Sequence, residues 1–166
     1  MIVYEASKKD FLHHVDQDVL VSKILETFEE KMGGTNDREI QSWDNSMLHM
    51  YRVLNDCAIP DEAGVAIEYN IPNTSKRVDF LLSGHDGDSD SVVIVELKQW
   101  QKVEKVQGKE AIVKTALNRG LRETAHPSYQ AWSYAALIED FNSSSRRLTC
   151  TRAPTYITTI SSRILR

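Results

Sequence analysis

Apolar positions in the first third of the chain recur with the period of α-helices. One helix is predicted to end at the Gly33-Gly34 pair, because the positions before it step by three and four: Val21, Leu25, Phe28 and Met32. A second helix is predicted to begin after a cap at Asn36 or Asp37 and to present one apolar face: Ile40, Trp43, Met47, Met50 and Leu54.

The pattern then changes to the alternation that is typical of strands. Three strands are predicted, bounded by polar turns, at VAIEYNI (65–71), RVDFLLS (77–83) and VVIVELK (92–98). The segment from Gln99 to Ala125 carries mixed signals, which fit a helix, a strand or an ordered loop. Its structure therefore stays open at this level.

A third helix is predicted to begin at Pro127 and to fade at Asn142, with one apolar face made by Ala131, Ala135 and Ile138. No acidic residue follows Asp140, whereas five arginines do, and TYITTI is a candidate for a last strand. The order of elements predicts an α/β fold, a mixed sheet flanked by helices. One domain is expected over residues 1–142, followed by a basic tail over 143–166.

Composition limits the class of protein. A chain of 166 residues with 41% hydrophobic residues fits one globular domain. It has no apolar run long enough for a membrane span and no secretory h-region, so we expect a cytoplasmic protein without a membrane partner. Cys57 and Cys150 share no motif with histidines, which argues against a disulfide framework or a zinc site. The net charge of −4 indicates that any contact with nucleic acid is local.

Candidate chemistry is concentrated in the last two predicted strands. The apolar run of the third strand ends in Glu96 and Lys98, which alternate to the same side. Asp79 lies between two apolar neighbours in the strand before it. If the two strands pair as a hairpin, Asp79 and Glu96 approach closely enough to share a hard divalent cation, with Lys98 beside it. A cation and a lysine in this arrangement suit hydrolysis of a phosphodiester.

These residues resemble a known family. Asp79 followed by Glu96-Leu97-Lys98 resembles the D…ExK signature of PD-(D/E)xK nucleases, although Arg77-Val78-Asp79 replaces the strict Pro-Asp. Gln130 and Tyr134 resemble the QxxxY motif of RecB-like members. The resemblance implies a restriction-endonuclease-like core of a helix, a three-stranded meander, a helix and a further strand.

A closer resemblance covers residues 1–142. The segments MIVYEA, SWDNSM, IEYNIPNTSKRVDF, VELKQW and HPSYQAWSYAALIEDF resemble the nuclease-like region that precedes Schlafen group 3-like helicase domains. A helicase partner, or a helicase domain that this version has lost, is implied. The chain itself has no GxxxxGK[ST] phosphate loop, so ATP hydrolysis is not expected.

The resemblance implies a nuclease that depends on Mg²⁺, for which Mn²⁺ could substitute. DNA is a more expected substrate than RNA. A homodimer would allow cleavage of both strands of a duplex. Asp79, Glu96 and Lys98 are the implied catalytic residues. The implied metal ligands are Asp79, Glu96 and the backbone carbonyl of Leu97, with Glu68 and Glu39 as further candidates. Candidate substrate-binding residues are Gln99, Gln130, Tyr134 and His126.

Each assignment has an alternative. Asp79, Glu96 and Lys98 also fit a structural ion cluster at a sheet end, and Glu68 fits a solvated strand residue. Glu39 fits the acidic first turn that a helix dipole favours. A structural role is likewise the alternative to a ligand role for Glu26, Glu29 and Glu30. His126 fits a helix cap, and Gln130 with Tyr134 fits a helix surface. The alternative function is a catalytically inactive nucleic-acid- or protein-binding module of a helicase-associated system.

Two further motifs favour structural roles. The acidic turn at Asp86, Asp88 and Asp90 lacks the glycine and the glutamate of a calcium loop, so we interpret it as a solvated turn. Trp43 fits a core stripe, whereas Trp100 lies next to the candidate site and is the tryptophan to test for stacking on bases.

Overall fold

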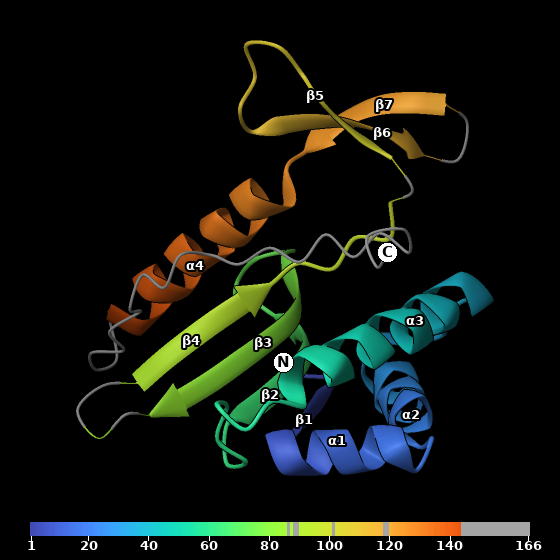
Figure 1. The fold of residues 1–166 in the computed structure, drawn as a ribbon, viewed down its shortest axis with the longest axis vertical. Coiled ribbons are helices and arrows are strands. Elements are labelled where there is room, and N and C mark those ends of the chain that lie inside the picture. The colour runs from blue at the N-terminus through green and yellow to red at the C-terminus, as the bar shows by residue number, and fades with distance from the viewer. Residues whose placement is uncertain (86, 88–89, 101, 118–119, 144–166) are drawn as a thin grey trace.

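The chain folds into an antiparallel sheet with helices on both faces and a second, smaller sheet beyond it (Figure 1). The computed structural model describes residues 1–85, 87, 90–100, 102–117 and 120–143, with side chains through Asp140. The larger sheet has the order β1 (Tyr4–Ser7), β2 (Gly64–Asn70), β3 (Arg77–His85) and β4 (Asp90–Val95). The helices are α1 (Lys8–Asp16), α2 (Leu20–Met32), α3 (Asp37–Leu54) and α4 (Pro127–Ser143).

Local signals begin and end the helices. Asn36 precedes α3, and its side chain accepts hydrogen bonds from the backbone N–H groups of Arg38 and Glu39. Ser7 precedes α1, where its hydroxyl accepts from the Asp10 backbone N–H and donates to the Asp10 carboxylate. Gly33 ends α2 with a φ of 89°, a conformation that glycine adopts without a steric penalty.

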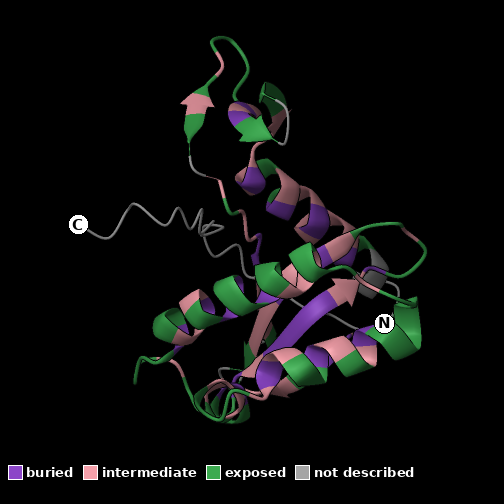
Figure 2. Cartoon of the chain, turned by 90° about the vertical axis from the view of Figure 1, so that its right-hand side faces the viewer, coloured by how far each residue is buried: buried purple, intermediate pink, exposed green. Residues whose placement is uncertain are grey.

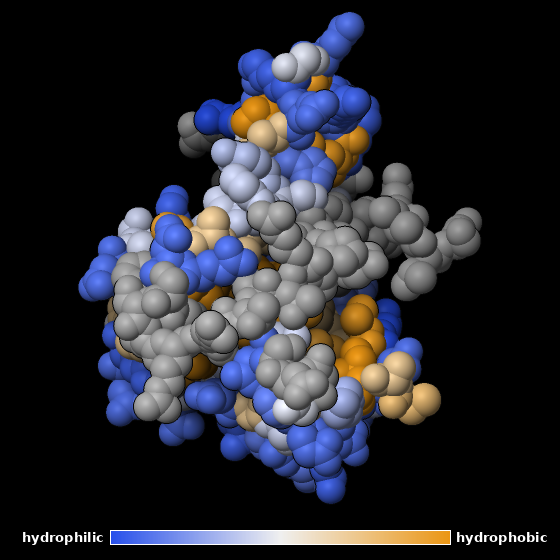
Figure 3. All heavy atoms as spheres, turned by 90° about the vertical axis from the view of Figure 1, so that its left-hand side faces the viewer, coloured by the Kyte–Doolittle hydropathy of each residue, from blue (hydrophilic) through white to orange (hydrophobic). Residues whose placement is uncertain are grey.

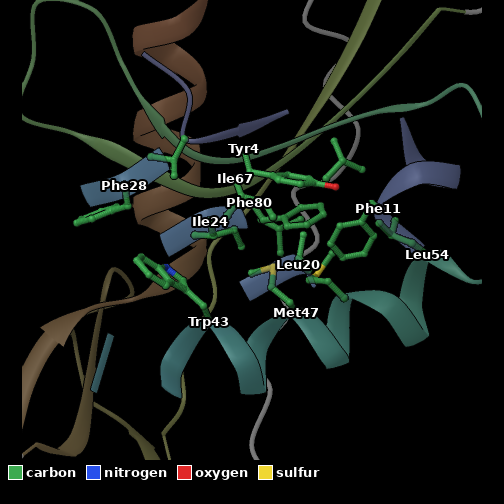
Figure 4. Close-up of a cluster of buried hydrophobic side chains, with 14 residues drawn as sticks. Tyr4, Phe11, Leu20, Ile24, Phe28, Trp43, Met47, Leu54, Ile67 and Phe80 are labelled. Carbon is green, nitrogen blue, oxygen red and sulfur yellow. The ribbon is translucent and has the colours of Figure 1, made fainter. Parts of the chain in front are cut away.

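Alternation along the central strands sends side chains to two helical layers. Phe80 pairs with Val95 and contributes to a core with α1, α2 and α3 (Figure 4). Leu81 pairs with Ile94 and packs with α4 in a second cluster. Because neighbouring strand residues point to opposite faces, α4 lies on one face of the sheet and the other helices on the opposite face. Figure 2 shows the buried sides of these elements turned toward the sheet.

The smaller sheet comprises β5 (Val103–Lys105), β6 (Ile112–Leu117) and β7 (Gly120–Ala125), in that order. It lies at the end of α4 that is close to Pro127 (Figure 1). Thr115 is fully buried, and its hydroxyl donates to the backbone carbonyl of Lys102. Apolar side chains remain exposed in this part of the molecule (Figure 3), among them Val103, Leu117 and Leu121.

Most of the sequence-based elements are confirmed. The helices expected before residue 55, the three strands and the helix at Pro127 are all present. The segment that the sequence left open forms β5, β6 and β7, and the N-terminal β1 and α1 were not expected. All strand pairs among the described residues are antiparallel, in contrast to the mixed sheet that we expected. The TYITTI segment and Cys150 lie outside the described residues.

Two details of the expected elements were wrong. The buried residues of α2 are Leu20, Ile24 and Phe28; Phe28 was expected, whereas Val21 and Leu25 are only partly buried and Met32 is exposed. Strand β4 ends at Val95, so Glu96 and Lys98 lie just beyond it. In the described part of the chain, no helix is both long enough and apolar enough to cross a bilayer.

The core predicts a large loss of stability when Phe80 is truncated. Phe80 is fully buried and meets Phe11 edge to face with ring centroids 5.7 Å apart. We expect Phe80→Ala to lower the free energy of unfolding by about 3–5 kcal/mol, measured by urea denaturation. The exposed Leu48 provides the control, and Leu48→Ala should change it by less than about 0.5 kcal/mol. Equal losses in the two variants would contradict the assigned core.

Candidate active site

Asp79 lies on β3 near α4, where its charge raises the pKa of Tyr134 after the larger effect of burial. Its strand neighbours Val78 and Phe80 are fully buried, whereas the Asp79 side chain is partly exposed. The β3–β4 register ends at the pair Phe80 and Val95, so Asp79 and Glu96 occupy the next opposed positions. The Asp79 carboxylate accepts a hydrogen bond of 2.9 Å from the backbone N–H of Leu97. This bond joins the end of β4 to β3 directly at the charged residues.

Glu96 and Lys98 meet Asp79 at this point. Lys98 Nζ lies 2.9 Å from Glu96 Oε2 and 3.5 Å from Asp79 Oδ2. The Glu96 side chain has no exposed surface, and among the described residues its Oε1 atom has no hydrogen-bond partner. A buried carboxylate oxygen without a partner is costly in a folded chain, which favours a ligand at that atom.

Helix α4 adds two polar side chains to the site, one of which contacts Glu96. Gln130 Nε2 donates to Glu96 Oε2 at 2.7 Å and to the Tyr134 hydroxyl at 3.0 Å. Gln130 and Tyr134 are one helical turn apart, so they share a face of α4. Their interpretation as decoration of a helix surface is wrong, because Tyr134 is buried and Gln130 contacts Glu96.

The electrostatics of the cluster follow from burial and proximity. Burial raises the pKa of Glu96 most, the Asp79 carboxylate raises it further, and Lys98 opposes both, so this pKa moves from 4.5 to about 7. Burial lowers the pKa of Lys98, but the charges of Asp79 and Glu96 outweigh it and raise that pKa overall. Burial also raises the pKa of Tyr134. Near neutral pH, Lys98 is therefore charged and Glu96 is poised between its two protonation states.

Glu68 and Glu39 belong to a second group of charges, on the α3 side of the sheet. Trp43 Nε1 donates to Glu68 Oε1 at 2.8 Å, and Arg77 Nε pairs with Glu68 Oε2. Arg77 Nη2 also binds Glu39 Oε1 at 3.0 Å. Glu68 is only 5% exposed, so the interpretation of it as a solvated strand residue is wrong. Glu39 does lie in the first turn of α3.

Gln99 and His126, the other predicted substrate-binding residues, make hydrogen bonds within the chain. Gln99 Nε2 donates to Ser42 and Ser46 of α3, which fixes the chain after Lys98 to that helix. His126 Nδ1 accepts from the Ser128 backbone N–H, the helix-capping role that was the alternative for it. Trp100 is half-buried.

Carboxylates elsewhere do not join the site. Glu26, Glu29 and Glu30 are exposed on α2. Asp90 pairs with His85 at the strand ends that flank the turn between β3 and β4, whereas Asp86 and Asp88 lie outside the described residues. The sequence-based analysis missed Arg77 and Trp43 as partners of Glu68. The available signal for Arg77 was its position on the same strand as Asp79, two residues before it.

The cluster fits a hard divalent cation with few protein ligands. Asp79 and Glu96 supply carboxylate oxygens, one of them unpaired and buried. Mg²⁺ is commonly held by one or two carboxylates and retained waters, so two such groups suffice. No group of three or more His, Cys, Asp or Glu side chains among the described residues is arranged as a metal site. The structural ion-cluster interpretation also matches the Lys98 contacts, but it leaves Glu96 Oε1 unexplained.

The raised pKa of Glu96 predicts a pH-dependent stability in the absence of divalent cations. The folded chain keeps the proton on the Glu96 carboxylate up to a higher pH than the unfolded chain does. The stabilisation that this proton provides is therefore complete below about pH 4.5 and is lost as the pH rises through 7. In EDTA, Glu96→Gln should therefore gain roughly 2–3 kcal/mol relative to the native chain between about pH 5 and 8. Urea denaturation across this range measures it. The exposed Glu62→Gln should show no such gain, and parallel profiles for Glu96→Gln and the native chain would contradict the prediction.

Comparisons of the chain with protein-family models, with curated proteins and with solved structures found no match.

Proposed function

We propose that the chain is a metal-dependent nuclease that hydrolyses phosphodiester bonds, with Asp79, Glu96 and Lys98 as its catalytic residues. The observation that carries the proposal is the convergence of Lys98, which follows β4, and Gln130, from α4, on one buried carboxylate. Lys98 and Gln130 both contact Glu96 Oε2, while the second oxygen of that carboxylate is without a partner. A purely structural ion cluster does not require this free oxygen.

Lys98 carries the positive charge of the site. The raised pKa keeps its ammonium charged at neutral pH, and its Nζ atom lies between the two carboxylates. From this position the ammonium can orient an attacking water and stabilise the charge that develops on the phosphate. A neutral side chain of the same length would lose both effects.

Asp79 and Glu96 are the residues that would hold the cation, and the backbone carbonyl of Leu97 stays a predicted third ligand. When bound, Mg²⁺ or Mn²⁺ would supply a Lewis acid and lower the pKa of a bound water. The pKa of Glu96 near 7 means that cation binding competes with a proton at this carboxylate. We therefore expect cation affinity, and with it activity, to rise with pH through neutrality.

Gln130 orients the Glu96 carboxylate through its side-chain amide. Tyr134 in turn accepts from Gln130, so the pair fixes the α4 side of the site. We propose that DNA, ahead of RNA, passes this side of the site, where Gln130, Tyr134, Gln99 and His126 are the candidate substrate contacts. His126 retains one ring nitrogen beside its capping bond for such a contact.

The order of α3, the β2–β3–β4 meander and α4 supports the restriction-endonuclease-like interpretation. The resemblance to nuclease-like regions found before helicase domains supports a helicase partner. Action as a homodimer and a cytoplasmic location stay predictions.

The test is cleavage of labelled single- and double-stranded DNA and RNA by the purified chain with Mg²⁺, Mn²⁺ or EDTA. We expect cation-dependent cleavage, and a loss of at least about 100-fold in Lys98→Ala, because a charge that stabilises the transition state is removed. Lys76→Ala is the matched control, since Lys76 is an exposed lysine in the turn before β3. It should retain activity within about threefold.

Two outcomes would change the assignment. If the folded chain cleaves none of the substrates with either metal but binds one of them, the alternative of an inactive nucleic-acid-binding module replaces the nuclease. Cleavage that survives in Lys98→Ala would move the catalytic residues elsewhere in the chain.

A further inference from the structure

Arg77 connects two acidic side chains that come from different elements. Its Nε atom pairs with Glu68 Oε2 of β2, and its Nη2 atom lies 3.0 Å from Glu39 Oε1 of α3. The guanidinium also lies over the Phe28 ring, with its carbon 5.5 Å from the ring centroid. Three contacts in different directions hold this side chain in one position.

The two carboxylates around Arg77 are themselves fixed. Glu68 is 5% exposed and accepts from Trp43, while Glu39 Oε2 accepts from the Thr35 hydroxyl at 2.8 Å. Glu68 has a φ of 56°, in the left-handed region that a glutamate rarely adopts, and the β2–β3 register passes over the opposed pair Glu68 and Asp79. A strained backbone at a buried charge is typical of a functional position.

This second group of charges adjoins the candidate active site. Arg77 and Asp79 are two residues apart on β3, and the Asp79 charge is close enough to raise the pKa of Glu68, although burial is the larger cause. Without Arg77, the Glu39 and Glu68 carboxylates would lack a counter-charge next to Asp79. Two carboxylates suffice for a divalent cation with retained waters, so a second cation could then bind beside the one at Asp79 and Glu96, as in a two-metal phosphodiesterase.

We propose that Arg77 is a built-in cation that occupies the position of a second metal ion, so that the chain binds a single divalent cation, at Asp79 and Glu96. The guanidinium neutralises the Glu39 and Glu68 pair with one positive charge and needs no free metal. Arg77 is thus a positioning residue, which sets the number of cations through Glu39 and Glu68. The inference rests on the proposed function only for the first cation.

The test counts Mn²⁺ ions bound per chain by equilibrium dialysis, with free Mn²⁺ measured by electron paramagnetic resonance, at about pH 7.5 where carboxylates are available. We expect one ion for the native chain and two for Arg77→Met. Arg77→Lys keeps the positive charge and should bind one. Arg77→Met combined with Glu68→Gln should also bind one, because the second position then lacks a carboxylate.

The outcomes separate the two proposals. The difference between Arg77→Met and the native chain tests the role of Arg77, whereas the count for the native chain tests the metal site of the proposed nuclease. Two ions in the native chain, or no additional ion in folded Arg77→Met, would overturn the role of Arg77. No ion in the native chain and one in Arg77→Met would retain that role and remove the metal site at Asp79 and Glu96.

Arg77→Met leaves two uncompensated carboxylates and is expected to be destabilised. Far-UV circular dichroism therefore accompanies each titration. If this variant is unfolded without metal, Mn²⁺ should restore its native spectrum, because an ion that binds only the folded chain stabilises it. No recovery at any Mn²⁺ concentration would also overturn the proposal.

Discussion

The candidate site depends on keeping the Glu96 carboxylate inside the protein. Glu96 has no exposed surface, and a carboxylate at such a position is tolerated only with compensating partners. Lys98 supplies the charge, and Gln130 supplies a hydrogen bond from α4. Together they satisfy one oxygen and leave the other available, and this asymmetry distinguishes the cluster from an ordinary buried salt bridge.

The sheet positions these groups by its alternation. Residues of β3 that follow Asp79 and residues of β4 that precede Glu96 pack alternately against α4 and against the N-terminal helices. This packing fixes the register, because a slip of one residue would exchange the two faces. Asp79 and Glu96 therefore meet beyond the last pair of the ladder, with Asp79 partly exposed and Glu96 fully buried. The bond from the Leu97 N–H to Asp79 replaces the next ladder bond at this end.

The candidate active site and the group around Arg77 differ in the side chain that carries the positive charge. In the first group the cation is a lysine, a compact charge that touches both carboxylates while one oxygen stays unpaired. In the second group it is an arginine whose guanidinium bridges the carboxylates from two elements and is held against a ring. The guanidinium places its charge against one oxygen of each of its two carboxylates, whereas the lysine leaves Glu96 Oε1 without a partner among the described residues. The first group is therefore the better candidate for a metal centre.

The sequence by itself determined the elements whose signals are local. Periodicity and caps placed α2, α3 and α4, and alternation placed β2, β3 and β4, because each pattern reflects one buried face. The candidate residues Asp79, Glu96 and Lys98 were also visible, since charges that interrupt apolar strands are conspicuous in a linear chain. Ser7 and Asp10, which form the cap of α1, were a local signal from which this helix could also have been predicted.

Only the tertiary structure decided which charges have partners. Glu68 looked like an alternating strand residue, yet the left-handed backbone and the contacts with Trp43 and Arg77 make it a buried member of a network. The apolar residues of segment 99–125 show no clear period. The small sheet buries few of its side chains, so its strands need no continuous apolar face. Contacts between residues far apart in the chain, such as Gln130 with Glu96, arise from packing of whole layers, and no local pattern encodes them.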